Sequence, residues 1–322
     1  MNKISAEELA YRQRLPLSIK VSMTKTRIRF FVEEFGLENV YVSFSGGKDS
    51  TVLLHIARQL YPDIQAVYLD TWMEYPQIRE FVKGFDNVVR LKPEKSLKQI
   101  ILDDGWCFPS KDVAEAIDGY RKGNQWAIRK LNGLNGKGKH SDFRQQYKKW
   151  LFLAENCPEK ISSRCCDDMK ELPVQKYEKE TGRKPIIATM ACESARRKET
   201  YLRKGCNSFD GKRPSSRPIA FWTENDILQY IVENHLEIAS PYGQIYEVGQ
   251  VQGQQSFLCD GCQYATTGEN RTGCMFCPVG MHLDKFKKFE RLKAYNKDLH
   301  DYIMEELGLI RLIEWVKENL KL

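Results

Sequence analysis

The stretch that decides the fold runs over residues 40–60 and reads VYVSFSGGKDSTVLLHIARQL. Its first five residues are rich in β-branched and aromatic side chains, which predicts a strand over 40–44. Residues 51–60 place apolar side chains at helical spacing, which predicts a helix that starts near Ser50. The two glycines in between allow a tight turn. The order strand, glycine loop, helix presents backbone N–H groups to an anion and therefore predicts a phosphate site.

The side chains of this loop supply the remaining parts of a nucleotide site. Lys48 offers a mobile cation for phosphate oxygens, and Asp49 offers the carboxylate that Mg²⁺ prefers alongside phosphate. The spacing differs from GxxxxGK[ST], so transfer of a γ-phosphate is not implied. The predicted nucleotide contacts in the loop are Ser45, Gly46, Gly47, Lys48, Asp49 and Ser50.

Strands and helices continue to alternate beyond the loop. Further strands are expected at 65–70, 87–91 and 185–190, and further helices after Pro76, before Gly182 and after Thr223, a good N-cap residue. Such alternation is typical of an α/β fold with a doubly wound, mostly parallel sheet. We therefore expect a nucleotide-binding domain over 1–235, followed by a cysteine-rich loop and C-terminal helices over 236–322.

Composition narrows the class of protein. The chain has 322 residues, of which 42% are hydrophobic, enough for a substantial core. No stretch approaches the roughly 20 apolar residues that span a bilayer, and the first 17 residues lack the apolar segment of a secretory signal. These features predict a cytoplasmic protein without a membrane partner. Ten cysteines then suggest metal ligands or reactive thiols, except for isolated ones such as Cys107 and Cys157, which are expected to be buried.

The segment 120–150 interrupts the alternation and looks inserted. It holds nine basic residues and one acidic residue, whereas the whole chain has a net charge of +7, so the remainder is nearly neutral. Aromatic side chains lie among the bases, as in proteins that bind nucleic acid. The predicted contacts with DNA or RNA are Arg129, Lys130, Lys148 and Lys149; a solvated insertion or a lid over the nucleotide is the alternative.

The loop SGGKDS resembles the PP-loop signature SGGxDS of ATP pyrophosphatases. Five further segments, in this order, resemble the phosphoadenosine phosphosulfate (PAPS) reductase family within that superfamily: LDTWMEYP (69–76), SRCCDDMKELP (163–173), TMACESARRKET (189–200), RPIAFWTENDI (217–227) and GCMFC (273–277). The resemblance covers roughly residues 40–280.

This resemblance implies an adenine nucleotide alpha hydrolase-like fold and an enzyme that cleaves ATP between its α and β phosphates. Pyrophosphate is released and an adenylated intermediate remains. The resemblance places Asp70 and Thr71 near the nucleotide. It also places Arg196 and Arg197 in a nucleotide or sulfate loop, where they would act in catalysis with Lys48 and Asp49.

One departure from the family bears on the reaction. Thioredoxin-dependent reductases of this family end in a Glu-Cys-Gly-Leu-His segment whose cysteine is the nucleophile, whereas no cysteine follows Cys277 here. We therefore expect an ATP-using relative closer to DNA phosphorothioation sulfurtransferases and tRNA thiolases, with a sulfur-donor protein or other complex subunits as partners. A sulfonucleotide reductase with an unusual reductant and a non-catalytic nucleotide-binding subunit of a larger, defence-related complex are the alternatives.

The clustered cysteines predict a metal site. Two Cys-x-x-Cys pairs, Cys259/Cys262 and Cys274/Cys277, are eleven residues apart, a spacing that suits a Cys₄ zinc ribbon. The family resemblance instead implies a [4Fe–4S] cluster held by an adjacent pair and the later Cys-x-x-Cys. The preferred ligands are Cys165, Cys166, Cys274 and Cys277, with Cys259 and Cys262 as alternates and Zn²⁺ as the alternative metal.

Overall fold

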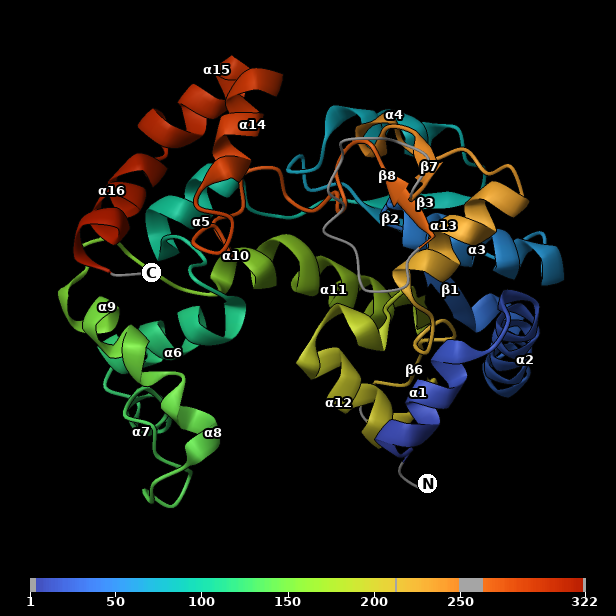
Figure 1. Ribbon diagram of the computed structural model, residues 1–322, viewed down its shortest axis with the longest axis horizontal. Coiled ribbons are helices and arrows are strands. Elements are labelled where there is room, and N and C mark those ends of the chain that lie inside the picture. The colour runs from blue at the N-terminus through green and yellow to red at the C-terminus, as the bar shows by residue number, and fades with distance from the viewer. Residues whose placement is uncertain (1–3, 212, 249–262, 321–322) are drawn as a thin grey trace. The chain divides into compact units, whose positions relative to one another are not determined.

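The computed structural model describes residues 4–211, 213–248 and 263–320 (Figure 1). The chain divides into two units, each built from two segments. Met1–Leu91 and Val174–Thr272 form the sheet unit, and Lys92–Pro173 and Gly273–Leu322 form the helical unit. This division differs from the contiguous domains 1–235 and 236–322 expected from the sequence, because the chain leaves the sheet unit after its third strand and returns to it before the fourth.

The sheet unit contains a six-stranded sheet in the order β3-β2-β1-β4-β6-β5. Its strands are β1 (Val40–Ser43), β2 (Ala66–Leu69), β3 (Val88–Leu91), β4 (Lys184–Ile187), β5 (Asn207–Ser208) and β6 (Ser215–Ser216). All neighbouring pairs are parallel except β5 and β6. The predicted α/β fold with a mostly parallel sheet is confirmed. A separate hairpin joins β7 (Ile245–Glu247) to β8 (Tyr264–Thr266).

Helices cover both faces of this sheet, as the alternation of side chains along its strands requires. Val40 and Val42 belong to the main core with α2 and α3, whereas Tyr41 and Val67 pack on Tyr177 of α11. The helices of the sheet unit are α1 (Ala6–Arg14), α2 (Leu17–Phe35), α3 (Lys48–Leu60), α4 (Pro76–Lys83), α11 (Leu172–Thr181), α12 (Ala195–Lys204) and α13 (Glu224–Glu233). The sheet is therefore doubly wound.

A buried ion pair fixes the start of α13. Lys20 Nζ of α2 lies 2.7 and 2.8 Å from the two carboxylate oxygens of Asp226, and both residues are buried. Asp226 also accepts a hydrogen bond from the backbone of Thr223, whose hydroxyl in turn caps α13 as the sequence predicts. Removing one partner of such a pair costs roughly 3–5 kcal/mol, since the other charge stays buried alone. The pair therefore determines where Glu224, the first residue of α13, is placed.

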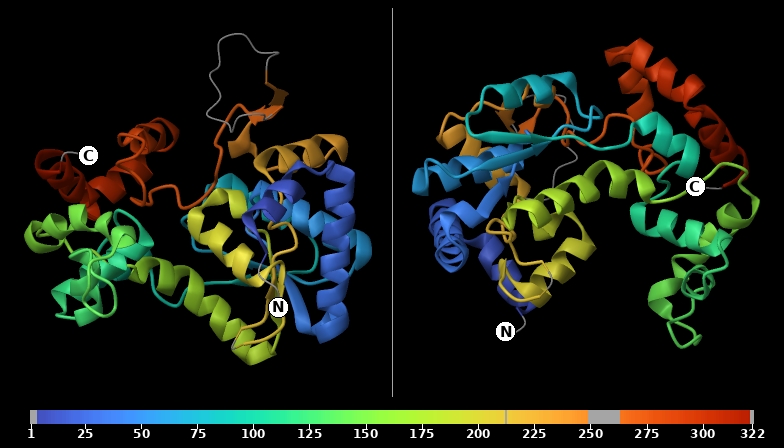
Figure 2. Two further views of the ribbon diagram at one scale, coloured as in Figure 1. Left: turned by 60° about the horizontal axis from the view of Figure 1, so that its bottom comes forward. Right: turned by 180° about the vertical axis from the view of Figure 1, so that it is seen from behind.

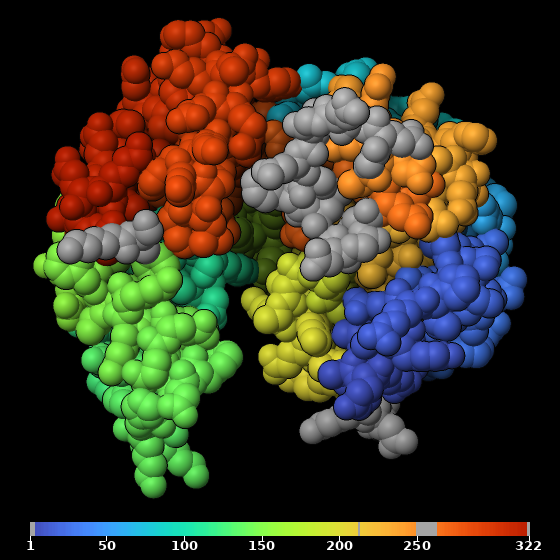
Figure 3. Space-filling model, in the orientation of Figure 1, coloured from blue at the N-terminus to red at the C-terminus, as the bar shows by residue number. Residues whose placement is uncertain are grey.

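The helical unit consists of α5 (Leu97–Asp104), α6 (Lys111–Arg121), α7 (Gln125–Leu131), α8 (Asp142–Gln145), α9 (Leu151–Asn156), α10 (Arg164–Cys166), α14 (Lys287–Tyr295), α15 (Lys297–Asp301) and α16 (Leu309–Asn319). Arg121 joins α6 to the end of α9, because its guanidinium donates to the carbonyls of Leu153, Ala154 and Cys157. The predicted C-terminal helices are confirmed. The basic segment 120–150 lies within this unit, and the loop between α7 and α8 projects from it (Figures 2 and 3).

None of the helices within the described residues combines the length and the apolar character that a membrane crossing requires.

Candidate functional site

The loop predicted to bind phosphate joins the end of β1 to the start of α3. Gly46 has a φ of +70°, and Gly47 is the N-cap of α3, which begins at Lys48, two residues earlier than expected. Ser50 Oγ accepts a hydrogen bond from Ser45 N at 3.1 Å and lies 3.0 Å from Ser45 Oγ. These hydrogen bonds hold the loop in a closed turn at the N-terminus of a helix, a geometry that suits an anion.

Packing against α4 leaves no room for a side chain at Gly46. A Cβ atom there would lie 2.7 Å from Val82 Cγ2 and 2.8 Å from Ile78 Cγ2. The left-handed φ and this close approach both require glycine. The second glycine of the motif is less constrained, because Gly47 has a φ of −78°.

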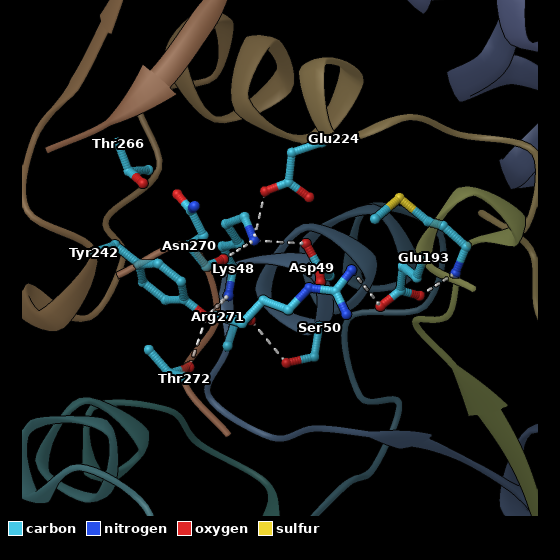
Figure 4. A network of polar contacts seen from close by, with 12 residues as sticks. Lys48, Asp49, Ser50, Glu193, Glu224, Tyr242, Thr266, Asn270, Arg271 and Thr272 are labelled. Carbon is cyan, nitrogen blue, oxygen red and sulfur yellow. Dashed lines mark hydrogen bonds and ion pairs between the residues drawn. The ribbon is translucent and has the colours of Figure 1, made fainter. Parts of the chain in front are cut away.

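Lys48 occupies a buried position at the base of the loop (Figure 4). Its ammonium lies 2.8 Å from Glu224 Oε1, 3.0 Å from the carbonyl oxygen of Asn270 and 3.5 Å from Asp49 Oδ1. Burial by itself lowers the pKa of this lysine, but the charges of Asp49 and Glu224 outweigh burial and raise the pKa above its ordinary value. Lys48 therefore carries a full positive charge at neutral pH.

Asp49 lies among charges of both signs. Burial raises the pKa of its carboxyl, Lys48 lowers it, and the nearby carboxylates of Glu224 and Glu193 raise it again, so that the net shift is upward. A divalent cation would relieve this repulsion. No group of three or more His, Cys, Asp or Glu is arranged to hold a metal ion in the part of the chain that the structure describes. A Mg²⁺ ion here would take most of its ligands from phosphate and water, as is usual for that ion.

Residues after α13 complete the surroundings of the loop. The hydroxyl of Tyr242 accepts a hydrogen bond from Lys48 N at 3.2 Å and lies 2.7 Å from Thr272 Oγ1. The Tyr242 ring centroid is 5.2 Å from Lys48 Nζ. Sequence reasoning missed Glu224, Tyr242 and Asn270, although Glu224 lies within the family-like segment 217–227. Tyr242 and Asn270 lie outside the quoted motifs, and only the fold brings the three residues to the loop.

Asp70 and Thr71 lie at the carboxyl end of β2, which runs beside β1. Asp70 is buried and binds Arg79 through both oxygens, at 2.9 and 3.1 Å. The hydroxyl of Thr71 donates to the carboxylate of Glu74 at 2.7 Å. Both residues thus lie at the end of the sheet where the loop begins, and their contact with a nucleotide stays a prediction.

Arg196 and Arg197 are exposed in the first turn of α12. The side chain of Ser194 caps this helix by accepting a hydrogen bond from Arg197 N. Arg197 forms an ion pair with Glu193. The Arg271 guanidinium lies 3.8 Å from the same carboxylate (Figure 4). Glu193 therefore holds Arg197 and Arg271 in the region of Asp49, where they can meet an anionic ligand.

In the helical unit, cysteines from distant parts of the chain approach one another. The thiol of Cys165 interacts electrostatically with those of Cys166, Cys274 and Cys277, and burial, followed by these neighbours, raises its pKa. Burial and Cys274 raise the pKa of Cys277 to about 11. The eight cysteines within the described residues are free thiols.

Cys107 joins the same group, which the sequence did not predict. Its thiol forms a hydrogen bond with Cys166, and this bond is the main reason that the pKa of Cys166 falls to about 7. Two backbone bonds bring the residue there, from Trp106 N to Lys160 O and from Ser162 N to Trp106 O.

The predicted metal ligands thus have different outcomes. Cys165, Cys166, Cys274 and Cys277 gather in one unit, yet they do not form a preformed metal site, and Cys259 and Cys262 lie outside the described residues. The [4Fe–4S] and zinc assignments stay predictions. The ammonium of Lys288 donates to the carbonyls of Cys274 and Cys277 and fixes the turn between them.

The four predicted nucleic-acid contacts differ in their surroundings. Lys130 is 13% exposed, lies 2.7 Å from Asp112 Oδ1 and packs over the Tyr147 ring. Arg129 donates to the carbonyl of Gly136. Lys148 and Lys149 are exposed. Lys130 therefore contributes to the fold of the helical unit. Of the two exposed lysines, Lys149 places its ammonium 4.9 Å from the centroid of the Trp150 ring.

Comparison with known proteins bears on the phosphate loop and the strands that flank it. Residues 39–105 match the sequence profile of the phosphoadenosine phosphosulfate reductase domain. The resemblance to the PAPS reductase family is confirmed over this range. The matched range contains the loop, Asp70 and Thr71, so nucleotide binding by a PAPS reductase-like domain is supported at the part of the chain where the site lies.

More distant likenesses extend beyond this range. The chain is 24% identical over 263 residues to an uncharacterized protein of Methanocaldococcus jannaschii, a match that covers 81% of this chain but only 45% of that protein. A PAPS reductase from Candida auris in a phosphate complex is similar in structure, with a TM-score of 0.40, 14% identity, and coverage of 74% of this chain and 90% of that one. The FMN adenylyltransferase of Candida glabrata has the same TM-score at 10% identity, with coverage of 73% and 64%.

The contact of Gly46 with α4 gives a prediction for stability. We expect Gly46→Ala to reduce the free energy of unfolding by about 1–2 kcal/mol through its left-handed φ and by about 1–3 kcal/mol more through overpacking against Ile78 and Val82. Gly182→Ala is the matched control, because Gly182 has a φ of +73° and open space around its Cβ position. Urea denaturation of both variants measures the difference, and equal losses would contradict the packing argument.

Proposed function

We propose that this chain is an ATP pyrophosphatase-type enzyme of the PAPS reductase family, which cleaves ATP between its α and β phosphates. The observation that carries the proposal is the preformed turn at the N-terminus of α3, with the protonated ammonium of Lys48 and the carboxylate of Asp49 at its base. Hydrogen bonds between Ser45 and Ser50 hold this turn in place without a ligand. Pre-organised donors of this kind stabilise charge without reorganising during the reaction.

Each residue of the loop then has a role in the reaction. Backbone N–H groups at the start of α3 and the Lys48 ammonium bind the β and γ phosphates, which leave together as pyrophosphate. Asp49 would hold a Mg²⁺ ion, which would offset the negative charge of the phosphates. An acceptor oxygen attacks the α-phosphorus, the bond from that phosphorus to the bridging oxygen breaks, and the electron pair departs on pyrophosphate. Arg197, which pairs with Glu193, and its sequence neighbour Arg196 would bind the charge that develops on the α-phosphate.

Sulfur transfer is the use of the adenylated intermediate that we propose. The proposal rests on the cysteines that gather in the helical unit, where the thiol of Cys165 interacts with those of Cys166, Cys274 and Cys277, a set that would suit an iron–sulfur centre. Cys165, Cys166, Cys274 and Cys277 would hold a [4Fe–4S] cluster. Because four cysteine ligands leave no iron open, the cluster would act through its charge and its structural role. Cys107 would donate a hydrogen bond to the Cys166 sulfur, an outer-shell contact that tunes such a centre.

Nucleic acid is the sulfur acceptor that we propose. The exposed side chains of Lys148 and Lys149 lie in a segment with nine bases and one acid, and several aromatic residues accompany them. Binding of a polyanion to such a segment is driven by the release of condensed counterions.

ATP turnover tests the first part of the proposal. Asp49→Ala and Lys48→Ala should each reduce pyrophosphate release by at least about 100-fold, the usual loss when one pre-organised electrostatic group is removed. The control is Asp63→Ala, an exposed carboxylate before β2, at the opposite edge of the sheet. Release is measured with MgATP and single-stranded nucleic acid present, and circular dichroism checks the fold. Full release by both loop variants would contradict the assignment.

Metal analysis after purification without oxygen tests the second part. We expect a brown protein with about four irons per chain and matching acid-labile sulfide. Cys274→Ala should remove the iron, and Cys165→Ala should do so if the adjacent pair supplies ligands. Cys206→Ala is the control, a buried cysteine of the sheet unit. One zinc per chain without acid-labile sulfide would contradict the cluster and support a zinc ribbon instead.

Charge reversal tests the acceptor. The triple variant Arg129→Glu, Lys148→Glu and Lys149→Glu should weaken binding of single-stranded DNA or RNA and reduce the slope of log K against log salt by about three, one for each phosphate contact. Lys130 is left intact because it pairs with Asp112. The control reverses three exposed lysines of the sheet unit, Lys83, Lys179 and Lys204. Equal binding of nucleic acid by the two triple variants would show that the basic segment 120–150 is not part of the site that binds the acceptor.

A further inference from the structure

One tryptophan of the sheet unit is held in a conformation that core packing does not explain. Trp72 follows β2 and has a φ of +63°, in the left-handed region that bulky side chains rarely adopt. Its side chain is not buried, because 63% of the residue is exposed. Single exposed aromatic residues are common on protein surfaces, but a strained backbone under an exposed ring is not, and such strain tends to lie at ligand sites.

Neighbouring charges hold the Trp72 ring in place. The guanidinium of Arg79 lies 3.4 Å from the ring centroid. Asp70 fixes that guanidinium through two hydrogen bonds, at 2.9 and 3.1 Å, and also accepts a bond from Trp72 N at 3.3 Å. These contacts form a closed set that connects the Asp70 carboxylate, the Arg79 guanidinium, and the indole and backbone N–H of Trp72. Because Arg79 covers one face of the indole, the exposed area belongs to the opposite face and the ring edge.

The segment that carries this ring leaves the sheet beside the phosphate loop. Ser43 of β1 pairs with Val67 of β2 in a parallel register, so the segments that leave the two strands start side by side at one edge of the sheet. The helix that carries Arg79 also packs on the loop, since Ile78 and Val82 approach Gly46. The segment that carries Trp72 therefore lies at the end of the sheet where the predicted nucleotide site has its mouth.

We propose that Trp72 is a stacking platform for a nucleobase at this mouth, an inference that rests on the proposed nucleotide site. A ring that is fixed beforehand loses little conformational freedom when a base stacks on it. The Arg79 charge is already balanced by Asp70, so the platform offers a flat aromatic face and no net charge. Its contribution to binding therefore varies little with salt, unlike that of the basic segment 120–150.

The base has two possible sources, the adenine of ATP and an unpaired base of the acceptor nucleic acid. Three probes separate them: MgATP, a single-stranded DNA hexanucleotide, and the same hexanucleotide with every base replaced by an abasic site. Trp72→Ala and Trp72→Gly should weaken at least one base-carrying probe about 5- to 100-fold, the usual range for one stacked base. Trp72→Phe should lose less, and binding of the abasic strand should not change.

Two controls protect the result from trivial causes. Trp72→Gly suits the left-handed φ, so its Tm should equal or exceed that of the parent and a loss of binding is not a loss of fold. Tyr11→Ala removes a ring of similar exposure, 65%, from α1 and should leave all three probes unaffected. Parent-like binding of both base-carrying probes by Trp72→Ala and Trp72→Gly overturns the platform, and so does an equal loss for the abasic strand.

The same measurements distinguish this inference from the proposed function. If the parent protein releases no pyrophosphate but Trp72→Ala weakens hexanucleotide binding, the result contradicts the proposed reaction and supports the platform. If the parent protein releases pyrophosphate and the Trp72→Ala variant binds both base-carrying probes normally, the result overturns the platform but not the proposed reaction.

Discussion

The buried ammonium of Lys48 is the interaction on which the candidate site depends. A charge that leaves water must be compensated by hydrogen bonds and opposite charges. Here the partners come from three places in the chain: Asp49 beside it, Glu224 at the start of α13, and the carbonyl of Asn270 beyond β8. Because each partner is needed, the loop, α13 and the segment after the hairpin must converge at one edge of the sheet.

Other constraints deliver these partners to their positions. The buried pair of Lys20 and Asp226 fixes the first turn of α13, and so it places Glu224 over the loop. On the other side, the contact of Gly46 with α4 sets the distance between that helix and the loop. Two ion pairs, Lys20–Asp226 and Lys48–Glu224, and one steric contact thus hold the site. They respond differently to substitution, because a charge left buried without its partner is costly, whereas a tight contact relaxes in part.

The helical unit brings its cysteines together by a different means. Backbone bonds between Trp106 and the chain near Ser162 carry Cys107 to Cys166, and the ammonium of Lys288 fixes the turn that holds Cys274 and Cys277. Burial and the neighbouring thiols raise the pKa of Cys165 and Cys277, whereas the hydrogen bond with Cys107 lowers the pKa of Cys166. The candidate anion site and the gathered cysteines therefore belong to separate units of one chain.

The sequence by itself determined what depends on neighbouring residues. The strand–glycine–helix order of residues 40–60, the cap at Thr223 and the alternation of strands and helices are local patterns, and the structure confirms each of them. Only the tertiary structure decided which distant residues meet: Glu224 and Tyr242 at Lys48, Cys107 at Cys166, and the division of the chain into two units with two segments each. The physical reason is that these contacts compensate buried charge and fill space across the fold, and no spacing along the chain records them.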